Sequence, residues 1–92
     1  VEFEFAEETE VSSSAVYWFD DTGRGECRIP ESWALLYRDG NDWKPVEMPS
    51  AFETALHKLN RVTFKQVRTK AMRLEVQLKR GWSAGIYEWE VK

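Results

Sequence analysis

Apolar and polar residues alternate along several short stretches of this chain. The clearest stretch covers residues 72–79 and reads MRLEVQLK, with its apolar side chains at every second position. A period of two residues predicts a β-strand that has one face in a hydrophobic core and the other face in water. The same alternation appears at the start of the chain, in VEFEF, and at its end, in IYEWEV.

The complete pattern predicts a protein built only from β-strands. Seven short strands are expected, at 1–5, 12–19, 33–38, 43–46, 61–65, 72–78 and 86–91. Polar stretches at 6–11 and 66–71 are expected to be connections between them. Several short strands separated by turns are typical of sandwiches and barrels. The predicted fold is therefore an all-β antiparallel sandwich of the jelly-roll type, formed by residues 1–92 as a single domain.

Two local motifs refine this picture. The run Asp39-Gly40-Asn41-Asp42 joins two apolar stretches and predicts a β-hairpin. Pro45 follows closely and places the second strand of this hairpin at an edge of the sheet. Ser50 and Glu53 have the spacing of a capping box, and Phe52, Leu56 and Leu59 follow at helical spacing. A short helix is therefore expected within 50–59.

Composition and charge exclude several classes of function. The 92 residues carry 13 basic and 16 acidic side chains, a net charge of -3. No basic stripe is present, which argues against a nucleic-acid partner, and no apolar run is long enough to span a membrane. The sequence has no Ser-His-Asp set, nucleophile elbow or phosphate-binding loop, so we expect no enzyme activity. Because the strand pattern is already in place at Val1, we expect the chain to be a piece of a longer polypeptide.

Metal and redox chemistry have little support in the sequence. Cys27 is the single cysteine and His57 the single histidine, so neither an internal disulfide nor a zinc site of the usual ligand count can form. Asp20, Asp21 and Glu26 are carboxylates that could bind calcium, but their spacing does not match a calcium-binding loop. No cofactor is therefore expected.

Strand parity predicts which loops share an end of the sandwich. If successive strands run antiparallel, the loops at 20–31, 47–60 and 79–85 lie together. We call this end of the sandwich the loop end. It brings together the polar and aromatic residues Asp20, Asp21, Arg24, Glu26, Arg28, His57, Asn60, Arg80, Trp82 and Ser83. Planar hydrogen-bonding groups beside an aromatic ring are what a protein site for neutral sugars needs.

Within this end, Trp82 is the leading candidate for a sugar platform, because it lies between Gly81 and Gly85 on a polar loop. The alternative is that Trp82 folds over the end of the sandwich or packs on a catalytic domain. Asp20 and Asp21 with Arg24 could bind sugar hydroxyls, or could form an ordinary loop ion pair.

His57 and Asn60 complete the candidate site, although a polar loop histidine is more often simply solvated. Trp18 is assigned to the core or to the covered outer face of its strand. Trp33, Trp43 and Trp89 each fit the alternation of their strands and are assigned to core or hairpin packing.

Several of these motifs resemble a known family. The runs AVYWFDD, SWALLYRDGNDWKPV, VTFKQVRTKAMRLEVQL and SAGIYEWEV are similar to the discoidin or coagulation factor V/VIII type C domain, within the galactose-binding-like fold. More narrowly, DDTGRGECRIPESWALLYRDGNDWKPVE and GWSAGIYEWEV resemble the C-terminal β-domain of bacterial β-L-arabinofuranosidase-like glycoside hydrolases. The chain departs from the type C pattern in starting late, without the usual first strands and without the cysteine pair of the animal domains.

The resemblance implies a non-catalytic accessory domain. In the hydrolase family the catalytic Cys and Glu lie on an upstream barrel, so Cys27 is not given that role. The implied function is a carbohydrate-binding module with a weak site at the loop end, and the implied partner is a glycan. The alternative is a structural domain that packs on the catalytic domain of the same parent chain or forms a homodimer, as the doubly apolar residues 16–19 suggest. Such hydrolases are often exported, but these residues assign no compartment.

Overall fold

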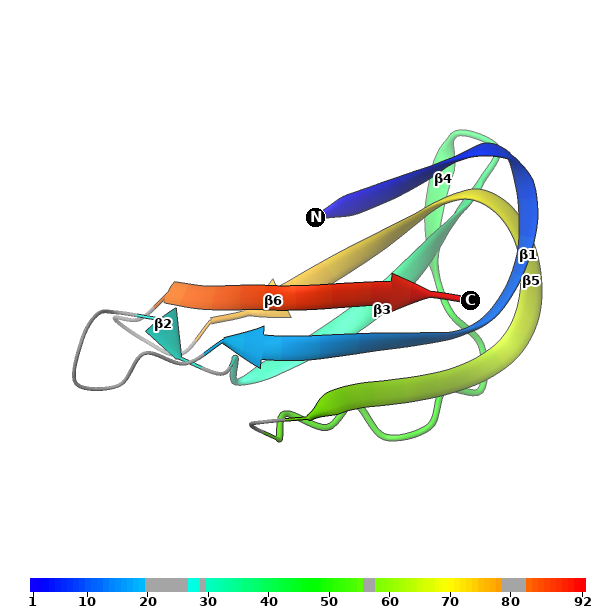
Figure 1. The fold of residues 1–92 in the computed structure, drawn as a ribbon. Helices are drawn as coiled ribbons and strands as arrows, with labels where there is room; N and C mark the ends of the chain where they lie inside the picture. The colour runs from blue at the N-terminus through cyan, green and yellow to red at the C-terminus, as the bar shows by residue number, and fades with distance from the viewer. Residues whose placement is uncertain (20–26, 29, 56–57, 79–82) are drawn as a thin grey trace.

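The computed structural model describes residues 1–19, 27–28, 30–55, 58–78 and 83–92. These residues form strands and no helix (Figure 1). The strands are β1 (Glu2–Phe19), β2 (Cys27–Arg28), β3 (Ser32–Asp39), β4 (Asp42–Pro45), β5 (Leu59–Gln77) and β6 (Ser83–Val91). They form one sheet in the order β2-β6-β1-β5-β3-β4, in which every pair is antiparallel except β2 with β6. The prediction of an all-β, largely antiparallel fold is confirmed.

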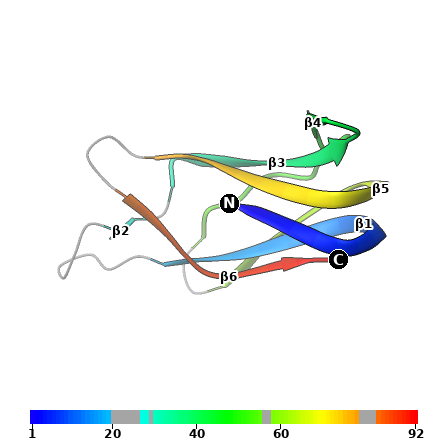
Figure 2. The same ribbon diagram turned by 90° about the horizontal axis from the view of Figure 1, so that it is seen from above.

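The sheet curls over on itself because β1 and β5 are long and bent (Figure 2). Their pairing runs from Glu2 opposite Arg73 to Tyr17 opposite Leu59. β3 pairs with the second half of β5, whereas β6 pairs with the second half of β1. The two halves of the curled sheet therefore face each other as the two layers of a sandwich.

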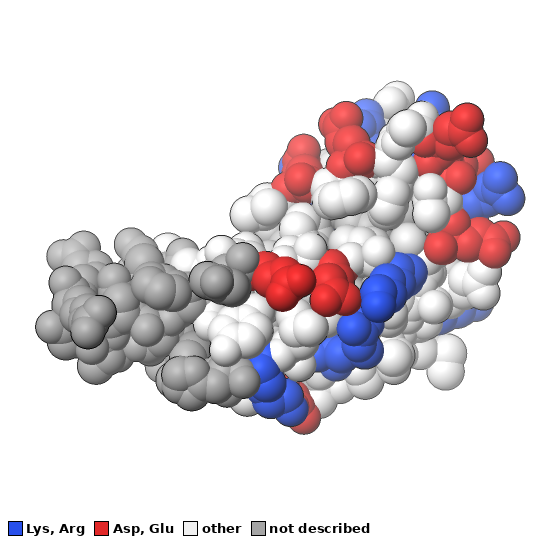
Figure 3. All heavy atoms as spheres, in the orientation of Figure 1, with Lys and Arg blue, Asp and Glu red and all other residues white. Residues whose placement is uncertain are grey.

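The predicted connections at 6–11 and 66–71 are wrong, because both stretches are strand residues within the bend. The pairing of β1 with β5 shifts register between Glu4 and Thr9, which lets β1 follow the longer path. The polar side chains of the bend are accommodated in strands because they lie on its outer surface, in contact with solvent. There Arg68 forms ion pairs with Glu8 and Glu10. Figure 3 shows both signs of charge over this part of the surface. Polarity here marks the outer surface of a bend and not the end of a strand.

The predicted helix at 50–59 is also wrong for the residues that the structure describes. Residues 51–55 have no regular secondary structure, and Leu56 and His57 lie outside the described part. The Ser50 hydroxyl oxygen accepts a hydrogen bond from the backbone N–H of Thr63 at 3.0 Å, and the Ser50 N–H donates to the Thr63 carbonyl at 2.8 Å. Ser50 therefore joins the connection to β5 and does not cap a helix.

The hairpin between β3 and β4 is confirmed. Asp39 pairs with Asp42, and Gly40 has a φ of 63°. A positive φ at the first residue of a two-residue turn favours glycine, as in type II′ hairpins. Lys44 forms an ion pair with Asp39 at 2.6 Å across the hairpin.

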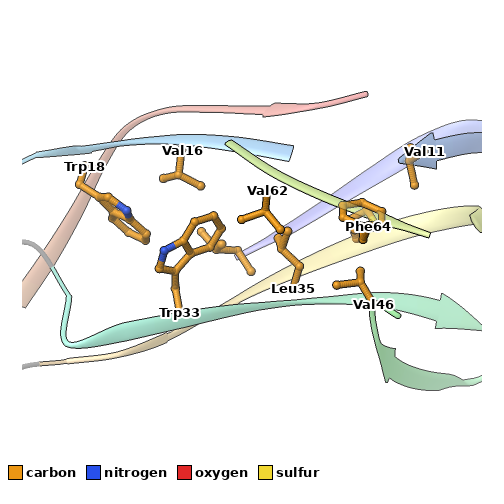
Figure 4. Close-up of a cluster of buried hydrophobic side chains, with 10 residues drawn as sticks. Val11, Val16, Trp18, Trp33, Leu35, Val46, Val62 and Phe64 are labelled. Atoms are coloured by element: carbon orange, nitrogen blue, oxygen red, sulfur yellow. The ribbon is translucent and has the colours of Figure 1, made fainter. Parts of the chain in front are cut away.

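The core lies between the two layers (Figure 4). One layer supplies Val16, Trp18, Val62 and Phe64, and the other supplies Trp33, Leu35, Met72 and Leu74. Val11, at the bend, and Val46 complete the buried cluster. Trp18 meets Trp33 edge to face, with ring centroids 5.6 Å apart. The predicted core positions of Trp18 and Trp33 are therefore confirmed.

A bulge in β6 changes which of its side chains face the core. Tyr17 pairs with Glu88 and Trp18 pairs with Ile86, so Tyr87 is an extra residue in the ladder. Both Ile86 and Trp89 pack against the buried cluster, although strict alternation would place them on opposite faces. Trp89 is thus a packing residue, as its sequence position predicts.

Candidate functional site

Several strand ends meet at one end of the molecule, opposite the bend (Figure 1). The backbone pairs there are Phe19 with Gly85, Cys27 with Ser83, Ser32 with Gln77 and Tyr17 with Leu59. These residues flank the segments 20–31, 55–58 and 78–83. The ends of β1, β2, β3, β5 and β6 that flank the three predicted loops therefore lie together, as strand parity predicts, whereas β4 ends at Pro45 beside Leu36, further toward the hairpin.

Most of the candidate sugar-binding residues lie outside the described part of the chain. These are Asp20, Asp21, Arg24, Glu26, His57, Arg80 and Trp82. Arg28 and Ser83 are placed by their backbone in β2 and β6. The roles assigned to these side chains stay predictions.

Asn60 is described, and the structure gives it a different role. Its side chain is buried, and its Nδ2 donates hydrogen bonds to the backbone oxygens of Val16, Ala55 and Lys58 at 3.2, 2.9 and 3.2 Å. Its Oδ1 accepts from the Ala55 N–H at 2.8 Å. The amide is fully engaged by the backbone, because it satisfies polar groups of a segment with no strand partner of its own. Asn60 therefore holds the segment before β5 in place, and its side-chain amide has no free donor or acceptor for a ligand.

Trp33, in the other layer, also binds the segment before β5, at residues 52–53. Its indole N–H donates a 2.8 Å hydrogen bond to the Glu53 carbonyl, and its ring meets Phe52 edge to face at 5.0 Å. Together with Asn60, this bond ties residues 52–55 to the core. Sequence reasoning missed this arrangement because a capping pattern and a loop that crosses a sheet use the same residue types.

The outer face of the sheet carries a charged cluster that the sequence did not reveal. The Glu2 carboxylate accepts hydrogen bonds from the Arg73 guanidinium at 3.1 and 2.5 Å, and that guanidinium lies 4.6 Å from the Trp43 ring centroid. The hydrogen bond from Arg73 lowers the pKa of Glu2 from its ordinary value. These contacts link β1, β5 and β4, and they place Trp43 in hairpin packing, as predicted.

A second electrostatic effect lies in the hairpin. The hydrogen bond and charge of Asp39 raise the pKa of Lys44 above its ordinary value.

Within the described residues no group of three or more His, Cys, Asp or Glu side chains could hold a metal ion. The interactions on the described surface are ion pairs between side chains and contacts between guanidinium groups and aromatic rings.

Comparison with known proteins gives one strong structural match. A solved chain of the Streptococcus pneumoniae beta-galactosidase BgaA superposes with a TM-score of 0.84 at 18% sequence identity, over 98% of this chain. The present chain spans 66% of that solved chain. No family model and no curated protein matches the sequence. At this level of identity the match shows a shared fold, found in a chain of a carbohydrate-active enzyme, while the two family resemblances stay predictions.

Proposed function

We propose that this protein is a non-catalytic accessory domain of a glycoside hydrolase and that it binds a sugar weakly at the loop end. The observation that carries the proposal is that the ends of β1, β2, β3, β5 and β6 that flank the candidate loops converge at one end of the molecule. The shared fold with a chain of a beta-galactosidase supports the enzyme context.

Each candidate side chain has a distinct role in the proposal. Trp82 supplies an aromatic face for the C–H patch of a sugar ring. Arg24 donates in-plane hydrogen bonds to sugar hydroxyls, while Asp20 and Asp21 accept them. His57 completes the polar rim. A shallow site of this composition is expected to bind in the millimolar to micromolar range.

An NMR titration tests the proposal directly. The ¹⁵N-labelled domain is titrated with galactosides, arabinan and arabinogalactan, and the indole N–H signals of Trp82 and Trp43 are followed. Saturable shifts of Trp82 and of residues 20–31 are expected, with Trp43 as an internal control because it lies on the hairpin at the other end of β3. Loss of these shifts in Trp82→Ala, with an otherwise unchanged spectrum, would assign the platform. A folded spectrum without shifts at tens of millimolar sugar would refute the sugar site.

A structural role is the second candidate, and exposed apolar residues favour it. Phe3 is 43% exposed and Val1 is 68% exposed, both at the start of β1. The Phe3 ring contacts Phe5 and Trp89, with ring centroids 5.1 and 6.2 Å apart. This aromatic group joins β6 to the first half of β1, although the backbone of β6 pairs only with residues 14–19 of β1. A neighbouring domain could cover these exposed rings.

A further inference from the structure

A wide bulge in β1 lies at the bend of the sheet, at the same end of the molecule as the β3–β4 hairpin (Figures 1 and 2). Glu4 pairs with Ala71, and Thr9 pairs with Thr69. Between these two pairs, four residues of β1 lie opposite a single residue of β5, Lys70. A bulge bends its strand and leaves residues without a partner in the ladder. The surface around Lys70 is therefore shaped by an irregular backbone and not by a flat ladder.

A hollow lies between this bulge and the hairpin, and we call it the bend hollow. It has a volume of about 350 Å³ and is lined by Glu8, Arg38, Gly40 and Lys70. It lies at the opposite end of the molecule from the loop end (Figure 1). Its volume is in the lower part of the range for small-molecule sites, so it suits a ligand of the size of one sugar ring.

Arg38 is held in place at the hollow by its backbone and by one of its side-chain nitrogens. Its backbone N–H donates to the hydroxyl oxygen of the buried Thr69 at 3.2 Å, and that hydroxyl donates to the Arg38 carbonyl at 2.8 Å. Its Nε donates to the Gly40 carbonyl at 3.2 Å. The two Nη atoms form no ion pair with a described residue. They are a planar fork that can bind both oxygens of one carboxylate.

Lys70 supplies a second cation to the hollow. It is exposed and forms no ion pair with any described residue. Glu8 is the acidic residue of the lining, and its Oε2 lies 3.3 Å from the Nε of Arg68, which balances its charge. The hollow therefore carries a net positive charge, which favours an anionic ligand. Glu8 Oε1 and the Gly40 carbonyl also offer acceptors for hydroxyl groups on that ligand.

We propose that the bend hollow binds a sugar acid, a single ring that carries one carboxylate and several hydroxyl groups. Arg38 and Lys70 hold the carboxylate, while Glu8 and the Gly40 carbonyl accept hydrogen bonds from the hydroxyls. A neutral sugar would leave both cations without a counter-charge, and a simple carboxylate would leave the two acceptors unused. This site is separate from the sugar site proposed at the loop end, and the inference does not depend on that site.

An NMR titration of the ¹⁵N-labelled protein with methyl glucuronide and methyl galacturonide tests this proposal through the amide signals of Gly40 and Lys70. Saturable shifts are expected, with a Kd in the millimolar range. Methyl glucoside and methyl galactoside, which lack the carboxylate, should bind at least about tenfold more weakly. Arg38→Gln should raise Kd at least about tenfold and Lys70→Gln at least about threefold. Lys65→Gln is the matched control, because Lys65 is an exposed lysine of β5 outside the hollow lining, and it should leave Kd unchanged.

Four results would overturn the proposal. One is a folded spectrum without shifts at tens of millimolar sugar acid, and another is equal binding of the neutral glycosides. The third is equal binding of acetate or of a blocked glutamate peptide, which would show that the hydroxyl groups are not recognised. The fourth is an equal loss of binding in Lys65→Gln and Lys70→Gln, which would show attraction by the overall charge. The titration with neutral sugars reads residues 20–31 at the loop end, so failure of one proposal leaves the other testable.

Discussion

The side chain of Asn60 and the backbone of Ala55 form a closed pair of hydrogen bonds. Oδ1 of Asn60 accepts from the Ala55 N–H at 2.8 Å, and Nδ2 donates to the Ala55 carbonyl at 2.9 Å. A side-chain amide here does what a neighbouring strand does elsewhere in the sheet, because it offers one donor and one acceptor in the same plane. The segment before β5 is therefore held without a strand of its own.

Replacing Asn60 should destabilise the fold strongly. Asn60→Ala leaves the Ala55 N–H and the carbonyls of Val16 and Lys58 without their partner, and we expect a loss of about 2–3 kcal/mol in the free energy of unfolding. Urea unfolding measures this loss. Gln77→Ala is the matched control, because Gln77 is exposed, and it should change stability by less than about 0.5 kcal/mol. Equal effects of the two substitutions would contradict the structural role of Asn60.

The two core tryptophans that touch each other should respond differently to the same substitution. Trp33→Phe removes the indole N–H that bonds the Glu53 carbonyl, whereas the N–H of Trp18 has no hydrogen-bond partner in the described part of the chain. Both changes remove a similar volume from the core. We therefore expect Trp33→Phe to cost about 1 kcal/mol more than Trp18→Phe in thermal or chemical unfolding. A larger loss for Trp18→Phe would show that its N–H has a partner.

The pair of Glu2 and Arg73 predicts a pH dependence. Arg73 lowers the pKa of Glu2 in the folded state, so the pair stabilises the fold above the ordinary pKa of a glutamate and this contribution is lost as the pH falls through the lowered value. A ¹³C titration of the Glu2 carboxyl should give a midpoint below the ordinary one. Arg73→Gln should return the midpoint toward the ordinary value, and 1 M salt should shift it in the same direction. An unchanged midpoint in Arg73→Gln would contradict the assignment of cause.

Acidic side chains near the open edges predict that the isolated chain is monomeric at micromolar concentration. Glu4 and Glu7 lie on β1, and Glu88 lies on β6, whose outer edge beyond Ala84 has no partner among the described strands. Like charges oppose pairing between two such edges. Sedimentation velocity should show a monomer, and the double substitution Glu4→Gln with Glu7→Gln should increase self-association. A stable dimer of the unaltered chain would favour the structural role over the sugar site.

The sequence predicted local elements well and their continuity poorly. The alternation at 72–78 and the turn at 39–42 depend on neighbouring residues, so strand and hairpin were both readable. The bend at 6–11 was misread as a loop because its polar residues are largely exposed while the backbone ladder with β5 continues. Such pairing depends on a partner about 60 residues away, which local pattern does not record.

The candidate site shows the same division. Residue types and strand parity predicted that the three loops share one end, and the flanking ends of β1, β2, β3, β5 and β6 agree with that grouping, while the end of β4 does not. The role of Asn60 was not readable, because an asparagine in a polar stretch suits a ligand site and a buried backbone clamp equally well. Only its burial decides between them.

The sequence by itself determined the all-β class, the buried and exposed faces of β3 and of the second half of β5, and the hairpin, since these follow from side-chain periodicity and turn chemistry. The tertiary structure alone decided that β1 and β5 are continuous and curled, that Tyr87 is an extra residue that shifts the faces of β6, and that the Asn60 side chain holds the segment before β5. These features arise from pairing between distant strands, where burial and backbone hydrogen bonding are satisfied together.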